Sequence, residues 1–119
     1  MSIVVIRESD GSIVRQGDSI TNFRDEEYTF KYGSRGLCRG KSGKVTVQRE
    51  GAKWSAEYYD SVFDCCAVDL SAGNSRELVA ERYGTESKVY EAFSRAIDAE
   101  VTAEIQQLLT SNPWQSKSE

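Results

Sequence analysis

The feature that most constrains the fold is a change in the spacing of apolar residues at Ser71–Asn74. Before this segment, short apolar runs alternate with turn residues at intervals of about ten residues, which is typical of β-strands. After it, apolar residues recur every three or four positions, which is the spacing of one helical face. The chain is therefore predicted to be α+β, with its strands first and its helices last.

The strand-rich part is expected to cover residues 3–70 as a small curved β-sheet or an SH3-like barrel. It begins with the β-type run Ile3–Arg7, and Asp10-Gly11 favours a hairpin after it. The run Glu27–Tyr32 has an aromatic residue at every second position, which predicts that Tyr28, Phe30 and Tyr32 share one face. Four glycines within residues 33–43 predict that this stretch has no regular element.

Two helices are expected to follow. The first spans Ser75–Tyr83 and ends at Gly84, and Thr85 is expected to cap the second. The second helix is long and amphipathic and stops at Pro113, and it is expected to pack on the sheet or to form a homodimer contact. Its apolar face is predicted to consist of Val89, Phe93, Ile97, Val101, Ile105 and Leu108, flanked by Tyr90 and Leu109.

The length of 119 residues predicts one domain over residues 1–112, with a β part at 1–70 and a helical part at 75–110. Residues 113–119 are predicted to be a flexible tail. The longest apolar run near the start is too short for a membrane span or a signal peptide, which predicts a cytoplasmic protein. The cysteine content agrees with this location, because an odd number of cysteines, two of them adjacent, does not suggest a set of disulfides. The adjacent Cys65 and Cys66 are expected to be strand residues on opposite faces.

The absence of histidine bears on function. It removes the commonest general base, the commonest metal ligand and every Ser-His or Cys-His nucleophile. We therefore expect a protein that is not an enzyme, with no catalytic residues, no metal and no cofactor. The carboxylates Asp60, Asp64 and Asp69 lack a ligand pattern and are expected to be turn or surface residues.

Charge is distributed unevenly along the chain, whose net charge is −4. Residues 31–53 carry seven basic side chains and one acidic one. Residues 1–30 carry three basic and six acidic side chains, and residues 54–119 carry five and twelve. An acidic protein is thus predicted to present one basic loop and hairpin. The predicted binding residues of this surface are Arg35, Arg39, Lys41, Lys44, Arg49 and Lys53.

The segment Gly36–Ser42 resembles a phosphate-binding P-loop only superficially. That motif requires four residues between its glycines and a helix after it, whereas here three residues separate the glycines and a strand-like run follows. A glycine-rich backbone beside Arg35, Arg39 and Lys41 is still suited to an anion-binding nest, and the alternative is a solvated hairpin loop. Aromatic contacts for a ligand are expected from Tyr32, Trp54 and Trp114, although Trp114 is also expected to fold back onto the barrel.

Four runs follow one another along the chain: Gly17–Glu26, Tyr28–Phe30, Gly40–Val47 and Glu57–Phe63. Over about residues 17–68 they resemble small, uncharacterised actinobacteriophage proteins that combine a DFRGE turn, a GKV.V strand and a REFY..VF ending. Asp25 stands where that pattern has glycine, and the C-terminal helix has no counterpart. The spacing is also similar to SH3-like, KOW-type small barrels. The resemblance implies a phage setting and no particular activity.

Three functions are compatible with these features. The first is a phage-encoded accessory protein that binds a host macromolecule, with a host protein as the expected partner, to counter a host defence or redirect a host process. The second is a nucleic-acid-binding module that uses the basic hairpin and nearby rings. The third is an enzyme or a sponge for a nucleotide signal, with the glycine-rich loop holding phosphate.

Overall fold

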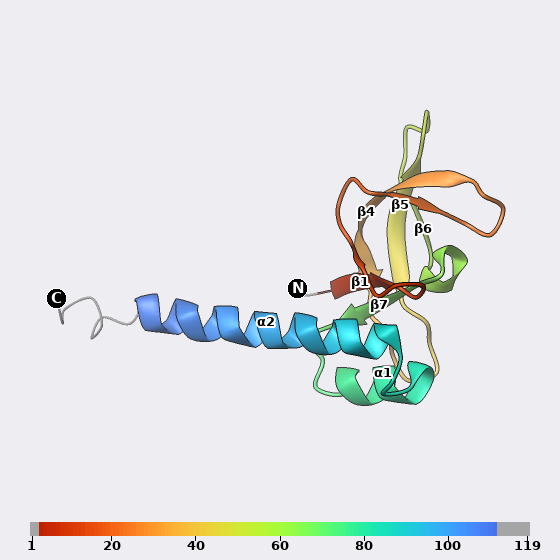
Figure 1. Ribbon diagram of the computed structural model, residues 1–119. Coiled ribbons are helices and arrows are strands. Elements are labelled where there is room, and N and C mark those ends of the chain that lie inside the picture. Colours follow the sequence, from red (N-terminus) through yellow and green to blue (C-terminus); the bar gives the residue numbers. More distant parts are fainter. Residues whose placement is uncertain (1–2, 112–119) are drawn as a thin grey trace.

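The computed structural model describes the backbone of residues 3–111 and the side chains of residues 3–99 (Figure 1). It is α+β, as predicted, with two antiparallel sheets and two α-helices. The strands precede the helices in the chain, which also agrees with the change in apolar spacing. The elements are β1 (Ile3–Arg7), β2 (Ile13–Val14), β3 (Ser19–Thr21), β4 (Glu27–Arg35), β5 (Lys44–Arg49), β6 (Ala56–Tyr59), the 3-10 helix η1 (Asp60–Phe63), β7 (Cys65–Asp69), α1 (Ser75–Tyr83) and α2 (Lys88–Ser111).

The two sheets and the helices form three layers. One sheet has the order β2-β1-β7 and the other the order β3-β4-β5-β6. Figure 1 shows β1 and β7 between the four-stranded sheet and the two helices. Strand β7 returns to pair with β1 along its whole length, from Ile3 opposite Asp69 to Arg7 opposite Cys65. The central position of β1 and β7 means that both faces of these strands are buried.

Each face of these two strands contributes to a separate hydrophobic core. Val5 and Cys65 lie in the core between the sheets, whereas Ile6 and Cys66 lie in the core under the helices. Successive side chains of a strand point to opposite faces, so adjacent residues enter different cores. The prediction that Cys65 and Cys66 point to opposite faces is confirmed.

Strand β4 differs from its prediction in two respects. It continues through Arg35, so the expectation that residues 33–43 hold no regular element is wrong for 33–35. The pairing of β4 with β5 also shifts register between Phe30 and Tyr32. A β-bulge of this kind inserts one residue and reverses the faces beyond it. Tyr28 and Phe30 are therefore buried, but Tyr32 is 59% exposed, and the prediction that all three share one face is wrong.

The helices begin and end close to their predicted positions. Helix α1 has the predicted bounds, and its last turn is closed by the Gly84 N–H, which donates to Ala80 O at 2.9 Å. Helix α2 is capped by Ser87, whose Oγ accepts the Tyr90 N–H at 3.1 Å, and not by Thr85 as expected. The cap lies two residues later because the turn Gly84–Ser87 closes on itself before the helix starts.

The first half of α2 covers the three-stranded sheet. Val89, Ala92 and Phe93 are buried against β1, β7 and α1, in agreement with the start of the predicted apolar face. Figure 1 shows the second half of α2 extending beyond the sheets. The predicted apolar residues Val101, Ile105, Leu108 and Leu109, the helix stop at Pro113, the tail 113–119 and Trp114 lie outside the described side chains or residues. A dimer contact through this helix stays a prediction.

Candidate anion-binding site

The glycine-rich segment folds into a tight hairpin. Cys38 and Lys41 exchange both backbone hydrogen bonds, each with an N–O distance of 3.0 Å, around Arg39-Gly40. Gly40 has a φ of +73°, in the left-handed region that glycine enters without a steric cost. The basic residues of this segment are thus presented on a hydrogen-bonded turn.

The hairpin is attached to β7 and to α1. The Leu37 N–H donates to Ala67 O at 2.8 Å, and the Leu37 side chain is buried in the core under the helices. Arg82 of α1 donates from Nη2 to the Ser42 Oγ at 2.9 Å. These contacts hold the turn at the junction between the four-stranded sheet and the helical layer.

Ser42 is held by two arginines. Arg35 Nη2 donates to the Ser42 carbonyl oxygen at 2.6 Å, while Arg82 binds the hydroxyl. The Arg35 Nε is buried and has no hydrogen-bond partner among the described residues. Two guanidinium groups therefore contact the same residue, which raises the local positive potential.

A pocket of about 460 Å³ opens beside this hairpin. Its lining combines two cations, two hydroxyls, a phenol ring and a glycine, and none of the described lining residues is acidic: Arg35, Gly40, Lys41, Ser42, Tyr59 and Ser61. A second hollow of about 290 Å³ lies on the α1 side of the hairpin, between Leu37 and Arg82, and Glu81 lines it. The first pocket is consequently the better anion site.

The ring of Tyr59 faces solvent because of strand alternation on β6. Tyr58 points inward and packs edge-on against Tyr28 and Phe63, at ring-centroid distances of 5.7 and 5.9 Å. The next residue, Tyr59, points outward and is 52% exposed. The Lys44 Nζ lies 5.2 Å from its ring centroid. The lining of the pocket therefore combines an exposed aromatic ring with Arg35 and Lys41, whereas Lys44 lies outside the lining and pairs with Glu57 at 3.5 Å.

The buried residue Asp60 links the end of the hairpin at Gly43 to strand β7. The Asp60 Oδ2 accepts the Ala67 N–H at 2.8 Å, and the Asp60 N–H donates to Gly43 O at 3.0 Å. Burial raises the pKa of Asp60 despite the opposing effects of the Ala67 hydrogen bond and the Arg82 charge. Asp60 is not the turn or surface carboxylate that was expected, since only 2% of it is exposed.

The predicted basic residues are distributed over the two ends of β5. Arg35 and Lys41 line the pocket, Arg39 lies on the hairpin 3.5 Å from Glu77, and Lys44 lies beside Tyr59. Arg49 is the last residue of β5 and Lys53 lies in the β5–β6 turn, which Figure 1 shows at the end of the sheet away from α1. Arg49 pairs there with Glu26 at 3.2 Å. The structure thus places two of the six predicted residues, Arg35 and Lys41, in the lining of the pocket, whereas Arg39, Lys44 and Arg49 each pair with a carboxylate.

The predicted aromatic contacts are also separated. Tyr32 lines a different cleft, and Trp54 is 82% exposed near the β5–β6 turn. Trp114 lies outside the described residues. Sequence reasoning missed Arg82, Ser42 and Ser61, and it did not single out Tyr59 among the aromatic residues near the basic run. Arg82 is 40 positions from its partner Ser42, and no local pattern reports such a contact.

The described residues contain no group of three or more histidine, cysteine or acidic side chains arranged to hold a metal ion. Within residues 3–111, neither helix has the length and apolar character needed to cross a membrane. Comparison of the chain with family models, with curated proteins and with solved structures found no match.

Proposed function

We propose that this chain is a non-enzymatic binding protein whose ligand is a nucleotide unit. The observation that carries the proposal is the pocket of about 460 Å³ that combines Arg35, Lys41 and the exposed ring of Tyr59, with no acidic side chain among the described residues that line it. The volume lies within the range of about 300–1,000 Å³ that small-molecule sites occupy.

The chemistry of each group supports this ligand. Guanidinium and ammonium groups bind phosphate through charge-assisted hydrogen bonds, and the Ser42 and Ser61 hydroxyls add neutral donors. The Ser42 carbonyl already orients the Arg35 guanidinium, which reduces the entropy that binding must remove. An exposed ring such as that of Tyr59 stacks on a base and contributes about 1–3 kcal/mol per base.

The nucleotide unit has two sources, a single strand of nucleic acid or a free nucleotide. The net charge of −4 opposes tight binding of duplex DNA, because that binding depends on extensive phosphate neutralisation. Binding of a short single strand requires the site to neutralise only two or three phosphates. Its affinity is then expected to fall with salt at a log–log slope of about −2.

Fluorescence anisotropy with a labelled oligothymidylate of about ten nucleotides tests whether the protein binds single-stranded nucleic acid. Thermal stabilisation of the protein by thymidine and adenosine monophosphates tests whether it binds a free nucleotide. We expect Lys41→Glu to weaken either interaction by roughly tenfold or more, because it places a like charge beside phosphate. Lys53→Glu makes the same change of charge at the other end of β5 and is expected to alter affinity by less than about twofold. If neither ligand binds, or if both variants lose affinity equally, the proposal is wrong.

Two finer assignments belong to this proposal. We propose an SH3-like barrel, supported by the return of β7 to β1 after the 3-10 helix η1 and by the bulged strand β4. We also propose that the protein is a phage-encoded accessory protein of the host cytoplasm, supported only by the sequence resemblance. In that setting, host nucleic acid or a nucleotide signal of host defence is the macromolecule or ligand that it engages.

A further inference from the structure

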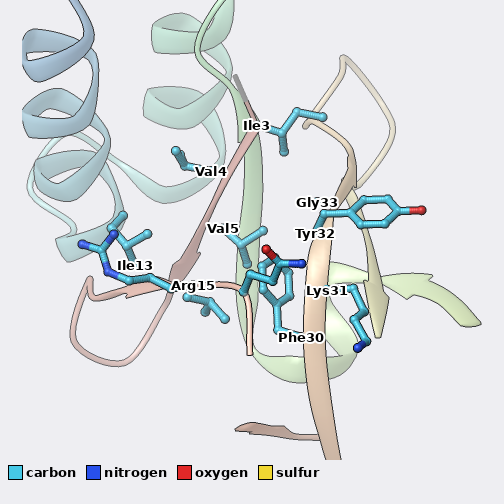
Figure 2. A pocket seen from close by; sticks show the side chains of 11 residues that line it. Ile3, Val4, Val5, Ile13, Arg15, Phe30, Lys31, Tyr32 and Gly33 are labelled. Atoms are coloured by element: carbon cyan, nitrogen blue, oxygen red, sulfur yellow. The ribbon is translucent and has the colours of Figure 1, made fainter. Parts of the chain in front are cut away.

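A cleft of about 500 Å³ separates β1 and β2 from β4 (Figure 2). Its inner side is apolar, because Val5, Val14 and Phe30 are buried there with 1–5% of their surfaces exposed. One end is closed where Ile3 meets β4, since a Cβ at Gly33 would lie 2.5 Å from the Ile3 Cγ2. The cleft is distinct from the pocket at the Arg39-Gly40 hairpin.

Both walls of the cleft are strand edges. Strand β3 pairs with β4 only from Glu27 to Thr29, and the Phe30 backbone then bonds to Gly17 and Asp18. From Lys31 onward, no described strand pairs with the edge of β4 opposite β5. On the other wall, β2 pairs with β1 only at Val5 and Ile6, so Ile3 and Val4 also have an edge without a described strand.

The rim of the cleft is cationic. Arg15 lies on the β2 side of the cleft and Lys31 with Tyr32 on the β4 side, where the β-bulge has turned Tyr32 outward; Figure 2 shows the side chains of Arg15 and Lys31 pointing away from one another. No acidic residue is among the described residues that line the cleft. An occupant is therefore favoured when it presents apolar groups inward and negative charge outward.

We propose that this cleft binds an extended segment of a partner protein by β-strand addition to β4. The segment has apolar side chains at every second position, which enter the cleft above Val5 and Phe30, and carboxylates between them, which meet Arg15 and Lys31. Strand addition gives affinity through main-chain hydrogen bonds and specificity through alternate side chains. The open edge at residues 31–34 spans about 13 Å at roughly 3.3 Å per residue, enough to pair with about four residues.

The test uses a capped peptide of about eight residues that alternates valine with glutamate, titrated into the ¹⁵N-labelled full chain. We expect backbone amide shifts at residues 31–34 and at Ile3 and Val4. A peptide with lysine in place of glutamate is expected to bind at least roughly tenfold more weakly. A glutamate peptide that is N-methylated at alternate residues is expected not to bind, because it has lost donors for the strand edge.

The double variant Arg15→Glu, Lys31→Glu is expected to bind the glutamate peptide roughly tenfold more weakly than wild type does. Lys53→Glu with Arg95→Glu is the matched control, because both residues are exposed and lie outside the cleft lining. Equal binding of the two peptides, unchanged binding of the N-methylated peptide, or no binding at all overturns the proposal. The same amide shifts on raising the protein concentration without peptide would assign the cleft to a second copy and also overturn it. Lys41 does not line this cleft, so the peptide result is independent of the nucleotide experiment.

Discussion

Arg82 and Ser42 form a hydrogen bond of 2.9 Å between the last turn of α1 and the Arg39-Gly40 hairpin. The helix thereby positions a turn that belongs to the other layer of the fold. Arg82 does not itself line the pocket that contains Arg35 and Lys41. Its effect on a ligand is expected to act through the placement of Ser42, which Arg35 holds from the other side.

The first prediction concerns this contact. Arg82→Ala is expected to lower nucleotide affinity by about two- to tenfold, the equivalent of one hydrogen bond of roughly 0.5–1.5 kcal/mol. Faster hydrogen exchange of the Cys38 and Lys41 amides should accompany it, because their mutual bonds close the turn. Arg95→Ala removes the same charge from an exposed position on α2 and should change neither quantity. Reduced affinity with unchanged exchange would instead show that Arg82 contacts the ligand directly.

The second prediction concerns the buried carboxylate of Asp60. Burial raises its pKa above the value of the unfolded chain, so the native state holds a proton more readily. Charging Asp60 therefore lowers the free energy of unfolding as pH rises from about 4 through the folded-state pKa. Asp60→Asn removes this titration and keeps an oxygen to accept the Ala67 N–H.

Urea unfolding of wild type and Asp60→Asn at several pH values measures this effect. We expect the stability of the wild type relative to the variant to decrease as pH rises from about 4 to 7. Asp98→Asn on the exposed side of α2 provides the control. A stability difference that is constant with pH contradicts a raised pKa. Asp60→Ala, which leaves the Ala67 N–H unpaired, is expected to cost about 1–3 kcal/mol at about pH 4 and less as the pH rises.

Local signals in the sequence predicted several elements well. The bounds of β1 and α1 agree with the expected ones, because a β-type run before Asp10-Gly11 and a helical period before Gly84 determine them locally. The opposite faces of Cys65 and Cys66 follow from strand alternation alone. These features need no information about distant residues.

The misplaced features depend on register and on contacts between distant residues. Alternation predicted that Tyr32 lies beside Phe30, but the bulge after Phe30 is created by pairing with β5. The basic run was predicted as one surface, yet the extended strand β5 separates Lys44 from Arg49, so the two halves of the run lie apart. Arg82 joins the site only because α1 packs on β7. None of these three facts is encoded within a short window of sequence.

The third prediction concerns thiol reactivity. Burial raises the pKa of Cys65 and of Cys66 to about 12, whereas Cys38 on the hairpin is exposed. A thiolate is the reactive species, so the two buried thiols should be inert in the native state at about pH 8. An aromatic disulfide reagent is expected to titrate one of the three cysteines quickly and all three in denaturant. Cys38→Ser should abolish the fast phase, and a fast phase that persists would mean that β7 opens readily.

The last prediction tests how firmly the helices are attached to the sheet. Phe93 is fully buried between α2 and the sheet, and the Arg76 guanidinium carbon lies 5.4 Å from its ring centroid on the α1 side. Phe93→Ala is expected to lower the free energy of unfolding by about 3–5 kcal/mol in urea, because the lost burial adds to the cavity that remains. Trp54→Ala removes a larger ring that is 82% exposed and should change stability by less than about 0.5 kcal/mol. A loss below about 1 kcal/mol for Phe93→Ala would show that the core under the helices readjusts. In that case α1 could not hold Arg82 rigidly, and the hairpin would depend on its contacts through Arg35, Leu37 and Asp60.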